Sequence, residues 1–323
     1  MTGEFEIGLN AAIVAILDNN PVILTIPGKR ADELDSLPYG PFRPGEHRTM
    51  EIGLRQWVEE QTNLRLGYVE QLYTFADRGR HRRPGDAGPH VISVGYLALT
   101  RPAEERDSQI SDAGWRNCYH YLPWEDWRTG RPQVLDEVIL PRIKTWILDH
   151  EKTLGEGGRS YDHNIRNRAR IAFGLNGIRW DEERALERYE LMYSAGMVEE
   201  AVADGRITQV TVDGDLGQPM RHDHRRILAT ALARLRAKLK YRPVVFELMD
   251  DEFTLFQLQQ TVESILGHTL HKQNFRRLVE TNQLVEPTGA TSLSTGGRPA
   301  ALFKFRREVM AERPAPGLRL GRS

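Results

Sequence analysis

Two helical segments joined by a short turn, within residues 252–285, constrain the fold of this chain more than any other feature. In the first segment, 252–267, Thr254 is a good N-cap and Gly267 ends the helix. Its apolar residues recur at helical spacing and are predicted to face a core. They are Leu255, Leu258, Val262 and Ile265. A second helix, 270–285, follows after a short turn, so the spacing is that of a helix-turn-helix unit.

The second helix has one apolar side and one side suited to nucleic acid. Phe275, Leu278 and Val279 are available for packing. The opposite side carries the predicted DNA-binding residues Lys272, Gln273, Asn274, Arg276 and Arg277. Arginine pairs with guanine edges and Asn or Gln with adenine, while further cations neutralise phosphates. Recognition helices point their first turns into the major groove, where these residues lie.

The segment after this helix, EPTGATSLSTGGRPAALFKF, has the pattern of a β-hairpin wing. Arg298 at its tip and Lys304 on its second strand are predicted to lie near a DNA backbone or minor groove. Residues 271–307 hold seven Lys and Arg against two Glu. The alternatives are a solvated basic face on an ordinary α/β module, or a winged helix that contacts protein instead of DNA.

Charge is distributed unevenly along the 323 residues, although the net charge is only −1. Residues 221–323 carry 18 Lys and Arg against 10 Asp and Glu, whereas residues 1–220 carry 26 against 35. A basic end on an acidic body favours a polyanionic partner for that end. The single cysteine, Cys118, excludes an intramolecular disulfide and fits a reducing compartment. With no apolar run of membrane-spanning length and no signal-like start, we expect a cytoplasmic protein without a membrane partner.

The N-terminal part predicts a mixture of strands and helices. We expect two strands within 6–26 around a turn at Asn19–Pro21, a helix over 48–62, and strands over 66–76, 90–100 and 118–127. Residues 133–205 are rich in helix formers, and 222–241 form a strongly amphipathic helix. The Pro-, Gly- and Arg-rich tail, 311–323, is predicted to be disordered.

A loop and helix near residue 50 follow the outline of the Nudix signature, G-x5-E-x7-R-E-U-x-E-E-x-G-U, where U is a bulky apolar residue. Gly40 and Glu46 match its first part, and RQWVEEQTNL, 55–64, resembles the second. Carboxylates three and four residues apart share one helix face and hold Mg²⁺ against a pyrophosphate. The signature therefore predicts a nucleotide-binding domain.

Neither alignment of this helix with the signature keeps all of its metal carboxylates. With Arg55 as the signature arginine, Glu59 and Glu60 are the glutamate pair, but Gln56 replaces the first glutamate. With Gln56 as the arginine, Trp57 and Gln61 replace two glutamates. Since an amide is a far poorer Mg²⁺ ligand than a carboxylate, we expect no catalytic residues and no metal site. Hydrolysis with substitute carboxylates such as Glu51 is the alternative.

The two halves together resemble the NrtR/NadQ group of Nudix-related transcriptional regulators of NAD metabolism. The resemblance is carried by KLKYRPVVFEL, the FTL-x2-LQ helix, KQNFRR and GRPAALFKF, with YTFADRGR and HVISVGYLAL in the first half. It implies an α+β chain: a Nudix-like α/β/α sandwich over 1–240 with a helical insertion at about 130–220, then a winged helix over 241–310. The insertion departs from NrtR and favours the NadQ branch.

The resemblance further implies a repressor of NAD biosynthesis genes that binds a palindromic double-stranded DNA operator as a homodimer. Its effector would be NAD, ATP or ADP-ribose, with no cofactor required and Mg²⁺ left open. Arginine suits phosphates, and the residues predicted to line the nucleotide pocket are Arg43, Glu46, Arg55, Glu59, Arg78, Arg80 and Arg82. The alternative function is an active pyrophosphohydrolase for ADP-ribose or NADH with an accessory winged helix.

Overall fold

The computed structural model describes residues 5–28, 30, 33–77, 79–80, 89–102, 113–154, 159–292, 299–312 and 317–318, and only the backbone of 153–154 and 159–164. Its first part is built around a mixed sheet with the order β4-β5-β1-β2-β6, in which β3 also pairs with β1. The strands are β1 (Phe5–Leu17), β2 (Asn20–Thr25), β3 (Tyr39–Pro41), β4 (Tyr68–Phe75), β5 (His90–Leu99) and β6 (Gly114–Asn117). Only β1 and β5 run parallel; the other neighbours are antiparallel.

The first hairpin turns one residue earlier than predicted. Leu17 pairs with Asn20, so the two turn residues are Asp18 and Asn19. Both have positive φ, 47° and 59°, a conformation that Asp and Asn tolerate in two-residue hairpin turns. Pro21 therefore lies inside β2, at the start of that strand.

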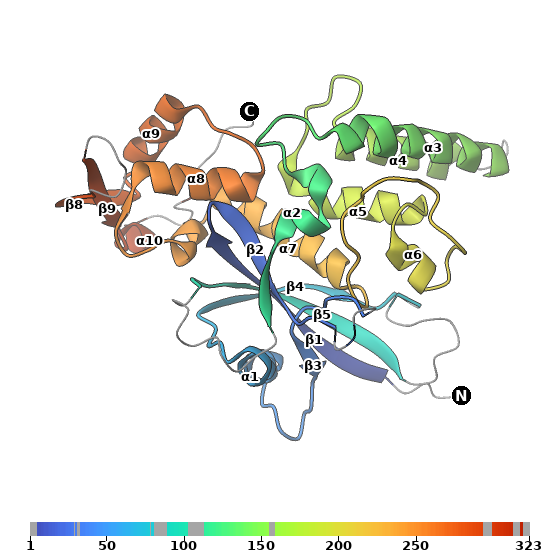
Figure 1. The fold of residues 1–323 in the computed structure, drawn as a ribbon, viewed down its shortest axis with the longest axis horizontal. Coiled ribbons are helices and arrows are strands. Elements are labelled where there is room, and N and C mark those ends of the chain that lie inside the picture. Colours follow the sequence, from blue (N-terminus) through green and yellow to red (C-terminus); the bar gives the residue numbers. More distant parts are fainter. Residues whose placement is uncertain are drawn as a thin grey trace.

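Helices cover both faces of the sheet, as the α/β/α prediction requires (Figure 1). On one face Leu9, Ala11 and Ile13 of β1 pack with Leu54 and Val58 of helix α1 (Met50–Thr62). The intervening β1 residues point to the opposite face, where α7 (His224–Leu239) lies across the sheet. Because successive strand side chains alternate between faces, a single long strand supplies both cores.

Helix α1 begins and ends where its sequence indicates. The Thr49 side chain accepts a hydrogen bond from the backbone N–H of Ile52, a cap typically worth about 1 kcal/mol. Asn63 ends the helix in the left-handed conformation, with φ of 55°. The predicted helix over 48–62 is thus confirmed, with its apolar side buried.

The predicted strand over 118–127 is wrong. Residues 118–121 form helix α2 (Cys118–Tyr121), and a 3-10 turn, Pro123–Glu125, follows it. Asn117 starts the helix, because its side chain accepts from the backbone N–H of Tyr119, and Pro123 opens the turn. The run of aromatic residues looked like a strand, but they enter the core from a helical turn.

The helices predicted from the helix formers in 133–205 are present. A π-helical segment, Leu135–Ile139, leads into a series of helices that lie on the α7 side of the sheet (Figure 1). They are α3 (Leu140–Leu154), α4 (Arg159–Ala172), α5 (Ala185–Ser194) and α6 (Glu199–Ala203), with a 3-10 turn at Glu182–Arg184. None of the described helices is long and apolar enough to cross a bilayer.

The C-terminal part is a winged helix. After a 3-10 turn, Val244–Leu248, helix α8 begins at a capping box in which Thr254 and Gln257 satisfy each other's backbone N–H groups. A three-stranded sheet with the order β7-β9-β8 completes the unit. Its elements are β7 (Phe253–Thr254), α8 (Leu255–Leu266), α9 (Lys272–Thr281), β8 (Val285–Ser292), β9 (Ala300–Phe305) and α10 (Val309–Glu312).

One hydrophobic core runs through both parts of the chain. The cluster that holds Leu232 of α7 also holds Leu258 of α8 and Val279 of α9. Leu318, which lies in the tail predicted to be disordered, is fully buried in the same cluster and donates its backbone N–H to the carbonyl of Leu239. The winged helix therefore packs directly against the first domain.

Candidate nucleic-acid interface and ligand pocket

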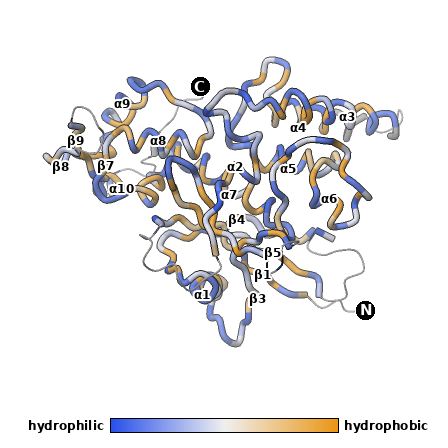
Figure 2. Tube along the Cα trace, viewed as in Figure 1, coloured by the Kyte–Doolittle hydropathy of each residue, from blue (hydrophilic) through white to orange (hydrophobic). Residues whose placement is uncertain are grey.

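Helix α9 presents a polar face to solvent. Phe275 and Val279 are its buried residues and pack against α8. The polar residues predicted to read DNA are all exposed: Lys272, Gln273, Asn274, Arg276 and Arg277. Figure 1 places α9 at the edge of the molecule, away from the main sheet, and in Figure 2 its hydrophilic and hydrophobic residues alternate as in a helix with one apolar side.

Most of these side chains are not committed to other parts of the chain. Arg276 Nε donates to Glu280 Oε1 at 2.8 Å, one turn along the same helix, and both side chains stay more than half exposed. Within the described residues, Lys272, Gln273, Asn274 and Arg277 have no side-chain hydrogen bond or ion pair. A polyanion approaching α9 thus meets three cations and two amides at little desolvation cost.

The wing strands β8 and β9 lie at the same end of the molecule as α9 (Figure 1). Lys304 on β9 pairs with Glu286 on β8 at 2.9 Å, and this hydrogen bond raises the pKa of Lys304. The side chain of Lys304 is 53% exposed, so it can still meet a phosphate. Arg298, predicted at the wing tip, lies outside the described residues.

The loop before α1 is shaped by two close contacts that sequence reasoning missed. A Cβ atom at Gly40 would lie 2.3 Å from the Trp57 ring, so the first glycine of the Nudix pattern is needed for packing. A Cβ atom at Gly53 would lie 2.6 Å from Nδ1 of the buried His47. His47 in turn accepts a hydrogen bond from the backbone N–H of Arg43, which fixes the loop against the helix.

The carboxylates on and before α1 each have a partner within the chain. Glu46 pairs with Arg43 at 3.1 Å, Glu51 with Arg55 at 2.8 Å, and Glu59 with Arg65 at 2.8 Å. Glu60 accepts from Gln56 Nε2 at 2.8 Å. In the described part of the chain, the one group of three carboxylates close enough to share an ion is Asp181, Glu182 and Glu183, which lie beside α5 and not on α1.

The predicted ligand residues do not form one site. Arg55 and Glu59 lie on α1, and Arg43 and Glu46 lie in the loop before it. Arg80 lies on the opposite side of the sheet, where it forms a bidentate bond with Glu190 of α5, 2.9 Å on each arm, and its guanidinium stacks on Tyr193 at 3.6 Å. Only 9% of its side chain is exposed, so Arg80 is held against α5 and lies apart from the other described ligand residues. Arg78 and Arg82 fall outside the described residues.

A buried charged cluster joins the first domain to the winged helix. Glu125, Arg188 of α5 and Arg236 of α7 are all fully buried. Arg188 holds both carboxylate oxygens of Glu125, at 2.6 and 2.9 Å, and Arg236 holds one of them as well. No sequence pattern pointed to this cluster, because its members come from three separate segments.

Comparison with known proteins agrees with this architecture. Residues 245–305 match the family model described as the NrtR DNA-binding winged helix domain. A stretch of 96 residues is 40% identical to the ADPR responsive transcriptional repressor NtrR of Acinetobacter baylyi. The match spans 30% of this chain and 38% of the relative, so less than half of that curated protein is covered.

Solved structures share the fold over nearly the whole chain. NrtR of Shewanella oneidensis, solved in complex with a 27-mer DNA, superposes with a TM-score of 0.54 at 18% identity, over 94% of this chain and 95% of that one. A MutT/nudix family protein from Enterococcus faecalis superposes with a TM-score of 0.51 at 15% identity, over 95% and 88% of the two chains. At such identities the likeness shows the fold. The fold is therefore that of a Nudix-like domain followed by a winged helix, and residues 245–305 resemble the NrtR DNA-binding winged helix domain.

Proposed function

We propose that this protein is a DNA-binding transcriptional repressor whose Nudix-like domain senses a nucleotide. The observation that carries the proposal is the exposed face of α9, with Lys272, Gln273, Asn274 and Arg277 uncommitted in the described structure, inside the segment that matches the NrtR winged helix. A stability role does not explain such a face, since none of these four side chains packs or pairs. We place the protein in the cytoplasm, where its operator is.

DNA recognition follows from the chemistry of this face. With α9 in the major groove, Gln273 and Asn274 in the first turn would pair with adenine edges, and an arginine with guanine. Lys272 and the wing residue Lys304 would hold phosphates and set the register on the duplex. Two copies acting as a homodimer would read a palindromic operator with half-sites about 34 Å apart.

The effector is proposed to be an NAD-related or adenine nucleotide. The curated relative from Acinetobacter baylyi is named as ADPR responsive, which favours ADP-ribose over NAD and ATP as the first ligand to test. Arg43 and Arg55 at the α1 side are the candidate phosphate contacts, since a guanidinium binds phosphate through paired N–H groups. Genes of NAD biosynthesis are the proposed targets.

The Nudix-like domain is proposed to have lost turnover. Magnesium would need several free carboxylates on α1, but Gln56 replaces one of them and Glu51 and Glu59 are held by arginines. These residues fit a nucleotide phosphate better than a metal ion. Binding without hydrolysis suits a sensor, because the effector must persist to report its concentration.

The experiment is a DNA-binding measurement on the full chain. Operator DNA is first selected from a random duplex library with wild-type protein, and affinity is then measured by fluorescence anisotropy with and without ADP-ribose, NAD or ATP. The double variant Arg276→Ala/Arg277→Ala is expected to lose specific binding, whereas Lys152→Ala/Arg168→Ala, which removes two exposed cations on α3 and α4, is expected to keep it. Equal affinity of both double variants would show that α9 does not bind DNA.

A further inference from the structure

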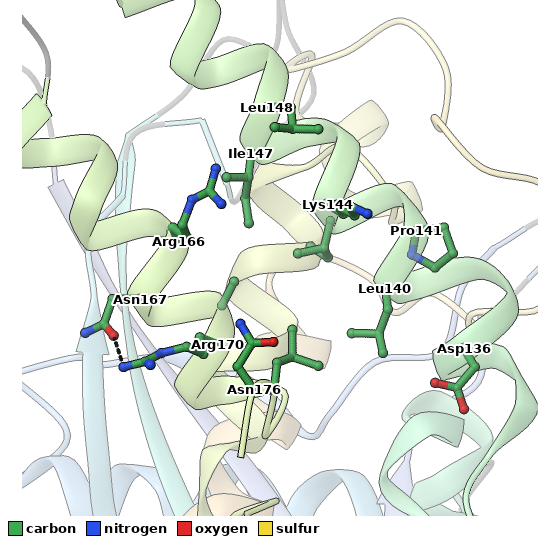
Figure 3. Close-up of a pocket in the computed structure, with 13 residues that line it drawn as sticks. Asp136, Leu140, Pro141, Lys144, Ile147, Leu148, Arg166, Asn167, Arg170 and Asn176 are labelled. Carbon is green, nitrogen blue, oxygen red and sulfur yellow. Dashed lines mark hydrogen bonds between the residues drawn. The ribbon is translucent and has the colours of Figure 1, made fainter. Parts of the chain in front are cut away.

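The helical insertion contains a cavity of about 820 Å³ between α3 and α4. Figure 3 shows its lining residues converging from the two helices and from the turn that follows α4. The volume lies within the 300–1,000 Å³ typical of small-molecule sites. The cavity lies on the α7 side of the sheet, so it is separate from the candidate nucleotide residues beside α1.

The floor and walls of this cavity are mainly apolar. They are formed by Leu140, Ile143, Ile147, Leu148, Ala169 and Leu175. Ile143 and Ala169 are each 1% exposed and belong to the main core, so the floor is a fixed surface. Leu148, in contrast, is 42% exposed at the wall. The cavity therefore offers an apolar surface that nothing in the described chain covers.

The rim of the cavity carries positive charge. Arg166 is neutralised by Glu151 at 2.6 Å, and Asp136 by Arg131 at 2.8 Å. Lys144 has no ion pair or hydrogen bond among the described side chains, and Arg170 bonds only the neutral Asn167, at 3.0 Å. Two exposed cations without an acidic partner among the described residues thus lie on the rim, one on each helix (Figure 3), and they favour a negatively charged ligand.

We propose that this cavity binds an amphipathic anion: a small molecule with an aliphatic or aromatic body and a carboxylate, sulfonate or phosphate head. The body would replace water over the exposed Leu148, and the head would pair with Lys144 on α3 or with Arg170 on α4, which lie on opposite sides of the cavity (Figure 3). A neutral ligand would gain no charge-assisted hydrogen bond from either cation, and a strongly polar ligand would bury no apolar surface, so both should bind more weakly than an amphipathic anion. This site is independent of the proposed nucleotide pocket.

The test uses the full chain and the fluorescent sulfonate 1-anilinonaphthalene-8-sulfonate, with decanoate and decanol as competitors. We expect saturable binding at one site, displaced by decanoate and at least about tenfold less effectively by decanol, because the head contributes charge-assisted hydrogen bonds. The variant Lys144→Gln/Arg170→Gln should weaken binding of the probe and of decanoate at least about tenfold and leave decanol unchanged.

Two further variants keep the result unambiguous. Leu148→Glu places a negative charge on the exposed wall of the cavity, and this charge should repel the anionic probe and abolish its binding. Lys152→Gln lies on the same helix but does not line the cavity, so probe binding should be unchanged. Circular dichroism melts show that each variant is folded. Probe binding that survives both Lys144→Gln/Arg170→Gln and Leu148→Glu would overturn the proposal. So would a loss of dimer mass in Leu148→Glu, since the face would then be an interface between copies.

Discussion

Arg236 on α7 donates from Nε to the backbone carbonyl of Ile265, 2.8 Å away, near the C-terminal end of α8. The same guanidinium reaches Glu125, whose carboxylate is also held by Arg188. Tyr119 adds a second link to α8, because its hydroxyl donates to the carbonyl of Ser264 at 2.6 Å. The last turn of α8 is thereby fixed to the first domain just before the turn that leads to α9.

We predict that Glu125→Gln destabilises the protein by about 3–5 kcal/mol, because two buried guanidinium groups lose their anionic partner. Urea denaturation at pH 7 measures this change. Glu137→Gln, which changes an exposed carboxylate twelve positions further along the chain, is the matched control and should shift the free energy of unfolding by less than about 0.5 kcal/mol. Similar stabilities of the two variants would show that the charge of Glu125 contributes nothing.

The pKa of Glu125 determines how the stability of the protein changes with pH. Burial raises the pKa of Glu125 and is the largest single effect, but the charges and hydrogen bonds of Arg188 and Arg236 together outweigh it and hold the pKa below the ordinary 4.5. Its stabilisation is therefore fully present above pH 4.5 and is lost as the pH falls below that value. We expect wild-type stability to drop more steeply than that of Glu125→Gln between about pH 4.5 and pH 3. Parallel curves would contradict this prediction.

Gly267 allows the close contact between α8 and the first domain, and its replacement is the third prediction. Its φ is 77°, and a Cβ atom there would lie 2.2 Å from the carbonyl oxygen of Glu125. Gly289 in β8 also has a positive φ, 84°, but a Cβ atom there would meet open space. Gly289→Ala should cost only the left-handed strain, about 1–2 kcal/mol. Gly267→Ala should cost clearly more in urea denaturation, because backbone must also move; equal costs would exclude the close contact.

Sequence reasoning succeeded where the determining contacts are local. The winged helix was predicted because Thr254 and Gly267 mark the ends of α8, and because the apolar positions of α8 recur at helical spacing. The helix over 48–62 was predicted for the same reason. Such signals span a few residues, so they survive in a sequence without any knowledge of distant partners.

The remaining features depend on residues far apart in the chain. Arg236 and Glu125 are 111 positions apart, and nothing in either neighbourhood indicates that they meet. Arg80 looked like one of several loop arginines free to bind phosphate, and only the fold brings it to Glu190, 110 positions away. A lone charged residue has the same appearance in a sequence whether it binds a ligand or a buried partner.

The fourth prediction separates positioning contacts from base contacts on α9. Lys272→Ala should weaken binding to specific and random duplexes alike and lower the slope of log Kd against log salt by about 0.9, the value for one phosphate contact. Asn274→Ala should leave this slope unchanged and weaken only the selected operator, by about 1–3 kcal/mol. Fluorescence anisotropy titrations at about 50 to 200 mM salt measure both the slope and the affinity for each duplex. An unchanged slope in Lys272→Ala would remove that residue from the phosphate contacts.

The last prediction restores part of the Nudix pattern. Gln56 Nε2 donates to Glu60 Oε1 at 2.8 Å, so Gln56→Glu places two carboxylates one helical turn apart with no proton between them. Mg²⁺ would relieve their repulsion, and at about ten times its Kd it should stabilise the variant by about 1.4 kcal/mol while leaving the wild type unchanged. Thermal melts with and without Mg²⁺ measure this stabilisation, with Gln209→Glu at an exposed position as control.

Mg²⁺-dependent hydrolysis of ADP-ribose is expected to be undetectable in the wild type, because Gln56 cannot replace a charged ligand. Efficient turnover by the wild type would instead show that Glu51 or Glu59 leaves its arginine to bind the metal, and the domain would then be an enzyme.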